Sequence, residues 1–185
     1  MALRGKIGRD GVLRANKNYN GSLMEAGKIA EEIVFKWLKE NPYGKEVIDT
    51  REFRFSQRLD VDCGIEDMHG RIVLGEIKSD KWLGKSQNIL FETNRINHFV
   101  PPYFYLGWGW RSPAERLYYY SPHLNAIYVF KFTELRKQIG IIISQTSPEI
   151  LHGWIKIVTT DKQKTTFNFV IPEELLINCF KIYKL

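Results

Sequence analysis

Residues 58–78 decide the fold, and they read RLDVDCGIEDMHGRIVLGEIK. Apolar and polar side chains alternate in both halves of this stretch, as they do in strands that bury one face. The segment 67–70, which ends in a glycine, separates the two halves in the manner of a tight turn. The pattern therefore predicts two adjacent strands joined into a hairpin.

Acidic and basic side chains fall on defined faces of this hairpin. Successive side chains of a strand point to opposite faces, so Glu76 and Lys78 share one face and Ile77 lies on the other. By the same count Asp60 and Asp62 share a face of the first strand. If the two polar faces coincide, these carboxylates and one ammonium group converge on a small patch of the sheet.

This patch has the composition of a divalent-cation site. Mg²⁺ takes oxygen ligands, commonly one or two carboxylates, with water and substrate phosphate in the other positions. Asp62 and Glu76 supply such carboxylates, and the backbone carbonyl of Ile77 is a candidate third oxygen. A metal held there lowers the pKa of bound water, and Lys78 is placed to orient that water or to stabilise the transition state. The set suits hydrolysis of a phosphodiester.

Two alternatives stay open at this point. Asp60 competes with Asp62 for the role of first metal ligand. Glu and Lys are also ordinary solvent-facing residues of a strand, and in that case the charged groups scatter over the solvated face of a basic interaction protein with no nucleic-acid role.

A helix is predicted upstream of the hairpin. Ser22 followed by Glu25 has the spacing of a capping box, and residues 41–44 contain the Pro and Gly that end a helix. Apolar residues recur between them at helical spacing, namely Leu23, Ala26, Ile29, Ala30, Ile33, Val34, Trp37 and Leu38. Glu31 lies among these apolar positions, where an unpaired carboxylate is costly to bury, so we expect it to point at the metal. A position on the rim of the helix is an equal alternative.

The order of these motifs resembles the PD-(D/E)xK nuclease superfamily. The resemblance rests on a Gly-x-x-x-Glu helix (27–31), a strand Asp, Gly70-Arg71 and the run GEIKS at 75–79, and it covers roughly residues 22–120. The segments 78–80 and 86–92 are similar to small phage- and plasmid-encoded members. The resemblance implies an α/β (α+β) fold with a restriction-endonuclease-like core, in which helices flank a mixed central sheet, with additional C-terminal strands and a helix.

The resemblance also implies a function. It assigns metal binding to Asp62 and Glu76, catalytic support to Lys78 and an accessory carboxylate to Glu31. The alternative carboxylates are Asp60, Asp80 and Glu92. The implied activity is that of an endodeoxyribonuclease in which Mg²⁺ or Mn²⁺ activates a water; the alternative is a catalytically inactive nucleic-acid-binding protein on the same fold. DNA against RNA, and endonuclease against exonuclease, stay open.

Composition sets the wider limits. The chain has 185 residues, 44% of them apolar and 26% charged, which is ordinary for a globular domain, and its net charge of +6 suits a polyanionic partner. We interpret residues 1–20 as a flexible basic arm and residues 21–185 as one nuclease-like domain. The residues expected to contact nucleic acid are Arg4, Lys6, Arg9, Lys81, Lys85 and Asn88.

Membrane and redox features point to a cytoplasmic protein. No apolar run approaches the roughly 20 residues of a membrane-spanning helix, so no membrane partner is expected. Cys63 and Cys179 are far apart in apolar settings, and we expect reduced thiols. A homodimer would suit an enzyme that cuts both strands of a duplex, although no residue identifies a self-complementary surface.

The rest of the chain alternates strand and helix signals. We expect a central, bent strand at 103–110, where aromatic side chains pack inward. Other expected elements are strands at 88–92, 117–120, 126–130, 151–158 and 165–170, a helix at 133–139 ended by Gly140, and a final helix from Pro172.

Overall fold

The computed structural model describes residues 6–7, 13–14, 19–41, 46–98, 103–160 and 164–185 of a mixed α/β fold. Its helices are α1 (Tyr19–Glu40), α2 (Arg54–Leu59), α3 (Trp108–Arg111), α4 (Phe132–Gln145), α5 (Pro148–Trp154) and the 3-10 helix η1 (Glu173–Cys179). Its strands are β1 (Lys6–Ile7), β2 (Leu13–Arg14), β3 (Glu46–Asp49), β4 (Cys63–Glu66), β5 (Ile72–Ser79), β6 (Asn88–Asn97), β7 (Tyr103–Leu106), β8 (Arg116–Ser121), β9 (Ala126–Lys131), β10 (Ile155–Thr160), β11 (Lys164–Pro172) and β12 (Phe180–Lys184).

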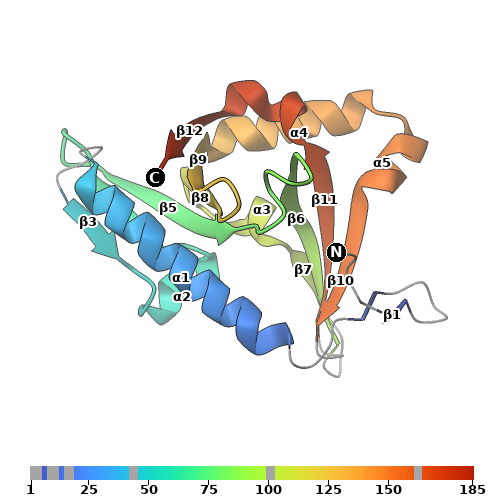
Figure 1. The fold of residues 1–185 in the computed structure, drawn as a ribbon, viewed down its shortest axis with the longest axis horizontal. Coiled ribbons are helices and arrows are strands. Elements are labelled where there is room, and N and C mark those ends of the chain that lie inside the picture. The colour runs from blue at the N-terminus through green and yellow to red at the C-terminus, as the bar shows by residue number, and fades with distance from the viewer. Residues whose placement is uncertain (1–5, 8–12, 15–18, 42–45, 99–102, 161–163) are drawn as a thin grey trace.

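The strands form two six-stranded sheets. The central sheet has the order β12-β9-β8-β5-β4-β3 and is mixed, because β5 runs parallel to β8 while the other neighbouring strands are antiparallel. The second sheet has the order β1-β2-β10-β11-β6-β7. Figure 1 shows α1 beside β3 and β5 on one side of the molecule, and β6, β10 and β11 on the other side. A mixed central sheet flanked by helices confirms the coarse fold class expected from the sequence.

Two hydrophobic cores cover the two faces of the central sheet. Between α1 and the sheet lies the smaller core, which includes Val34, Trp37, Cys63, Ile77 and Tyr118. The larger core lies on the opposite face, where Leu117 and Tyr119 of β8 pack with residues of β6, α3 and α4. Burial of both faces explains why β8 reads as a continuous apolar run rather than an alternating one.

The hairpin predicted over residues 58–78 is confirmed in its second part. β4 and β5 are antiparallel, Cys63 pairs with Gly75, and the turn between them is closed by the Gly70 N–H, which donates to the Asp67 carbonyl at 3.0 Å. The expected strand over 58–62 is wrong. Arg58 and Leu59 end α2, and Asp60 adopts a left-handed conformation with φ of 53° that stops this helix.

Helix α1 confirms most of the predicted buried positions. Ala30, Val34, Trp37 and Leu38 are all buried, whereas Ile29 is 55% exposed. The predicted capping box is wrong, because α1 begins at Tyr19 and Ser22 therefore lies inside the helix. The predicted stop falls partly on residues 42–45, which lie outside the described residues.

The later elements match the expected strands better than the expected helices. β8, β9 and the β10–β11 hairpin are present. The bent central strand is wrong, because β7 ends at Leu106, lies at the edge of the second sheet, and is followed by α3. Gly140 does not end a helix, since α4 continues through it to Gln145. Residues 151–154 belong to α5 and not to a strand, and β12 is a strand that the sequence pattern does not predict.

The expected basic arm is described only in part. Lys6–Ile7 and Leu13–Arg14 form two short strands that pair with each other, and Arg14 pairs with Thr159 of β10. Arg4 and Arg9 lie outside the described residues, as does the side chain of Lys6.

Candidate active site

Strand β5 presents an acid and an amine to the larger core. Glu76 is 1% exposed, and Ile77, on the other face, is buried under α1. The Lys78 ammonium group donates a hydrogen bond to Glu76 Oε1 and forms an ion pair with it. The Lys78 side chain is 30% exposed, so this pair connects the buried carboxylate with solvent. The shared face predicted from period two is confirmed.

Asp62 is held against the same short segment of β5 by two hydrogen bonds. Its backbone N–H donates to the Gly75 carbonyl at 2.9 Å. Its carboxylate Oδ2 accepts from the Ile77 N–H at 2.7 Å. Gly75 and Ile77 flank Glu76, so the two acids come from neighbouring segments and meet at one place on the sheet.

Asp60 is committed to a different partner. Its Oδ2 accepts a hydrogen bond from Arg111 Nε at 2.9 Å and a second one from Arg111 Nη2. The Asp60 carbonyl also accepts from the Ser112 hydroxyl at 2.6 Å. A guanidinium group that donates twice already occupies this carboxylate, so Asp62 is the better placed of the two candidate metal ligands.

Burial sets the electrostatics of the cluster formed by Asp62, Glu76 and Lys78. Burial raises the pKa of Glu76 well above its ordinary range; the Lys78 charge opposes this shift, and the Asp62 charge adds to it. Burial by itself would lower the pKa of Lys78, but the charges of Glu76 and Asp62 outweigh it, and the pKa is raised. Lys78 is therefore a protonated cation at neutral pH.

One oxygen of the cluster has no hydrogen-bond partner. Within the described residues, Glu76 Oε2 is buried and makes no hydrogen bond. Buried polar groups are nearly always hydrogen-bonded, and a buried carboxylate oxygen without a partner costs folding free energy. A bound cation would satisfy this oxygen and would offset the mutual repulsion of Glu76 and Asp62, so the donor set fits a hard divalent metal.

Glu31 lies in a separate ion-pair cluster. Its Oε2 accepts from Arg51 Nη1 at 3.1 Å, and the same guanidinium binds Glu32 and Asp49. Arg51 also stacks 4.2 Å from the centroid of the Phe35 ring. Helix α1 packs on the Ile77 face of the sheet, opposite to Glu76 and Lys78. The rim alternative therefore describes Glu31 better than a position pointing at the metal.

The other two candidate carboxylates serve local structure. Asp80 Oδ1 accepts from the Trp82 N–H at 2.7 Å in the loop after β5, and Tyr119 donates to its Oδ2 at 3.3 Å. Glu92, on β6 of the second sheet, accepts from Arg95 at 2.8 Å and from the Trp108 N–H at 3.3 Å.

The expected nucleic-acid contacts lie in the loop that leaves the site. Lys81 and Lys85 are exposed and flank Trp82, with ammonium groups 5.6 and 6.0 Å from its ring centroid. Asn88 is half-buried at the start of β6, where it pairs with Pro172.

Sequence reasoning missed the residues that α3 brings to the cluster. The Lys78 ammonium group lies 5.5 Å from the centroid of the Trp108 ring, and Arg111 binds Asp60. The Tyr105 ring lies 5.6 Å from the Arg111 guanidinium and 5.7 Å from that of Arg95. Trp108 and Arg111 are far from Asp60 and Lys78 along the chain, and Tyr105 and Arg95 belong to the second sheet. No short-range sequence pattern therefore predicts that they lie near the cluster.

No protein-family model, no curated protein and no solved structure matches the chain. In the part of the chain that the structure describes, no group of three or more His, Cys, Asp and Glu side chains is arranged to hold a metal ion. None of the described helices combines the length and apolar character needed to cross a bilayer.

Proposed function

We propose that this protein is a Mg²⁺-dependent nuclease that hydrolyses DNA phosphodiester bonds. The observation that carries the proposal is the buried, unpartnered Oε2 of Glu76, which lies beside Asp62 and Lys78 on a sheet. Burying a carboxylate next to a second acid costs desolvation energy, and a protein that binds no metal there would gain nothing from this arrangement.

The proposed roles follow from the donors. Asp62 and Glu76 would hold Mg²⁺ or Mn²⁺, with the backbone carbonyl of Ile77 as a further oxygen. Two carboxylates suffice, because Mg²⁺ keeps several waters and binds substrate phosphate directly. When bound, the ion supplies an activated water and neutralises charge on the phosphate. Lys78, which stays protonated, would stabilise the extra negative charge on the phosphoryl oxygens.

The surroundings support a polyanionic substrate. The net charge is +6, and Lys81 and Lys85 lie in the loop that directly follows β5. Arg95 and Arg111 add two guanidinium groups beside Tyr105. Basic groups next to aromatic rings suit a nucleic-acid backbone and its bases.

Plasmid cleavage tests the proposal. Supercoiled DNA is incubated with Mg²⁺ or with a chelator, using wild type, Glu76→Gln, Lys78→Met and the control Glu66→Gln, an acid at the far end of β4. Glu76→Gln and Lys78→Met should each lower the cleavage rate by about 100-fold or more, because the first removes a proposed metal ligand and the second removes the cation that would stabilise developing negative charge. Glu66→Gln should cut like wild type. Wild-type rates for both cluster variants would overturn the proposal.

Metal binding gives a second readout that needs no turnover. An ion that binds the folded state at about 100 times its Kd stabilises it by about 2.7 kcal/mol. Mg²⁺ should therefore raise the melting temperature of wild type and of Glu66→Gln, and leave that of Glu76→Gln unchanged.

One observation favours the alternative of a DNA-binding protein that does not cut. Lys78 already pairs with Glu76 Oε1 and so places a cation where a metal would bind. This alternative predicts salt-dependent DNA affinity that a chelator does not alter, no thermal shift with Mg²⁺, and no cleaved product.

A further inference from the structure

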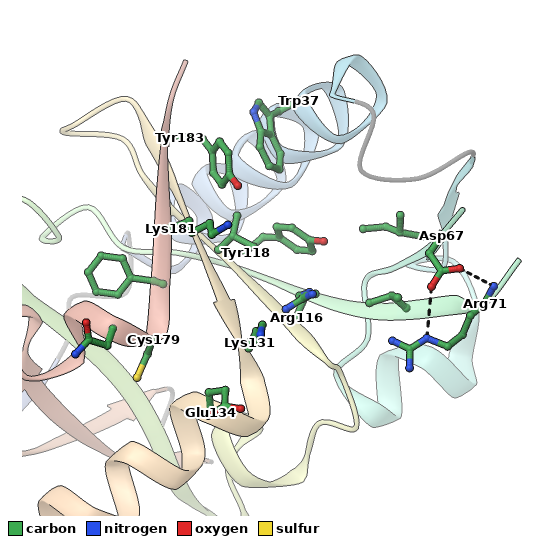
Figure 2. Close-up of a pocket in the computed structure, with 15 residues that line it drawn as sticks. Trp37, Asp67, Arg71, Arg116, Tyr118, Lys131, Glu134, Cys179, Lys181 and Tyr183 are labelled. Atoms are coloured by element: carbon green, nitrogen blue, oxygen red, sulfur yellow. Dashed lines mark hydrogen bonds and ion pairs between the residues drawn. The ribbon is translucent and has the colours of Figure 1, made fainter. Parts of the chain in front are cut away.

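A cavity of about 520 Å³ opens on the α1 face of the central sheet (Figure 2). Its walls come from α1, β4, β5, β8, β9 and β12, and the start of α4 and the end of η1 complete it. Glu76 and Lys78 lie on the opposite face, and the cavity is therefore separate from the candidate active site.

Cations gather in this cavity by the register of the strands. Arg116 of β8 pairs directly with Lys131 of β9, and Lys181 of β12 pairs with Val129, two residues before Lys131. Side chains in register lie on the same face, so three positive groups occupy one corner of the sheet. Like charges directly opposite each other destabilise a sheet, so the pairing of Arg116 with Lys131 costs stability unless an anion offsets it.

The acids around the cavity do not neutralise this corner. Arg71 also lines the cavity, but it pairs with Asp67 and Glu115 at 3.6 and 2.9 Å. Within the described residues, no ion pair joins Arg116, Lys131 or Lys181 to an acid.

Glu134, the other acid in the lining, lies near Cys179. Burial raises the pKa of that thiol, and the Glu134 charge adds to the shift. Apart from the Arg71–Asp67 pair, the lining holds three cations (Arg116, Lys131 and Lys181) and one acid (Glu134), so it keeps a net positive charge.

Aromatic rings form the wall next to the cations. The centroids of Trp37 and Tyr183 are 5.0 Å apart, and Tyr118 lies 6.3 Å from Trp37. Figure 2 shows the Trp37 and Tyr183 rings close to Lys181, with Arg116 and Lys131 farther along the same face. Aromatic faces stack on flat heterocycles with little dependence on their identity.

We infer that this cavity binds a nucleoside phosphate. The phosphate would lie on Arg116, Lys131 and Lys181, and the base would lie against the half-buried Tyr183, whose ring is supported by the buried Trp37. The cavity volume is in the range of small-molecule sites, and the combination of an aromatic wall with a few convergent charged groups is typical of them. The inference does not depend on the proposed nuclease activity, because it uses other residues on the other face of the sheet.

Calorimetric titration without divalent metal tests the inference. AMP, ADP, adenosine and inorganic phosphate are titrated into wild type, into Lys131→Gln/Lys181→Gln, and into the control Lys28→Gln/Lys156→Gln, which removes two exposed lysines elsewhere. We expect a nucleotide to bind at least about tenfold more tightly than phosphate or adenosine, and the cavity variant to lose about tenfold or more, since each charged hydrogen bond contributes on that scale. The control variant should bind like wild type.

Tyr183→Leu separates the two halves of the site. It should weaken nucleotide binding and leave phosphate binding unchanged. Equal affinities of wild type for AMP and phosphate would overturn the assignment of a nucleoside, and wild-type nucleotide binding by Lys131→Gln/Lys181→Gln would overturn the site. The melting temperature of Lys131→Gln/Lys181→Gln checks that this variant is folded. It should be unchanged or higher than that of wild type, because Lys131 lies directly opposite a second cation, Arg116. Loss of DNA cleavage by Glu76→Gln has no bearing on these titrations.

Discussion

The Asp62 carboxylate accepts a 2.7 Å hydrogen bond from the backbone N–H of Ile77, the residue between Glu76 and Lys78. A backbone donor inside a sheet is more rigid than a side chain, so this bond fixes one Asp62 oxygen relative to β5. Preorganisation of this kind lets a charged site act without reorganising during the reaction. The relationship separates Asp62 from Asp60, which binds Arg111 instead.

Asp62→Asn and Asp60→Asn should therefore behave differently. In Asp62→Asn the new amide oxygen can still accept from the Ile77 N–H, so the fold is kept while a charge is lost. We expect Asp62→Asn to lower Mg²⁺-dependent cleavage by about 100-fold or more. Asp60→Asn should keep most of the activity and lose stability, by about 1–3 kcal/mol, because it leaves Arg111 without its charged partner. Cleavage assays and urea unfolding of both variants check this, and the reverse ranking of activities would make Asp60 the ligand.

Glu76 should make the metal-free protein less stable as the pH rises. Its pKa is raised in the fold, so between the ordinary carboxyl pKa and the raised value the folded state binds more protons than the unfolded state. The free energy of unfolding then falls with pH across this window, by about 1.4 kcal/mol for each unit of pKa difference. Below the ordinary pKa both states are protonated, and the effect vanishes.

Glu76→Gln removes this titration. In the presence of a chelator the variant should have a flatter profile of unfolding free energy above the ordinary carboxyl pKa of about 4.3, and a higher stability than wild type at the alkaline end. Glu66→Gln is the control, since that acid lies away from the cluster. Identical pH profiles for wild type and Glu76→Gln would show that burial of Glu76 carries no such penalty.

The amino-acid pattern predicted β5 because its physics is local. Alternation places Glu76 and Lys78 on one face whatever the rest of the chain does, and the middle of β5 is buried on both faces. The alternation predicts Asp62 on a strand, but Asp62 lies in the short connection between α2 and β4. Asp62 reaches β5 because the left-handed backbone of Asp60 ends α2 and redirects the chain. Sequence alternation carries no information about such a conformation.

The positions of Glu31 and of the α3 residues could not be predicted from local sequence patterns. An amphipathic helix shows which of its faces is buried, but not which face of a sheet it covers, so Glu31 was expected near the metal and lies beside Arg51. Trp108 and Arg111 reach the cluster because α3 joins the two sheets. That arrangement depends on tertiary packing, which overrides the strand propensity of the aromatic run.

Lys81 and Lys85 should contribute to DNA affinity without affecting sequence preference. Each lysine that neutralises a phosphate adds about 0.9 to the slope of log affinity against log salt concentration for duplex DNA. Lys81→Gln/Lys85→Gln should therefore reduce the slope by about 2. The control Lys28→Gln/Lys156→Gln makes the same change in net charge at exposed sites on α1 and β10. Fluorescence anisotropy at several salt concentrations distinguishes them, and equal slopes for the two double variants would mean that only net charge matters.

Gly75 should be essential for the packing of the site. A Cβ added there would lie 2.5 Å from Cys63 Sγ and 2.8 Å from Cε2 of Tyr118, closer than atoms can pack. Gly75→Ala should destabilise the fold by about 1–3 kcal/mol, the usual cost of overpacking a core. Because the Gly75 carbonyl accepts from the Asp62 N–H, the shift should also displace this acid and lower cleavage.

Gly27→Ala is the matched control, since nothing lies within 4 Å of its added Cβ and the change within helix α1 should stabilise the protein by up to about 1 kcal/mol. Urea unfolding measures both effects, and a Gly75→Ala protein as stable and active as wild type would contradict the close packing of β4, β5 and β8 at this point.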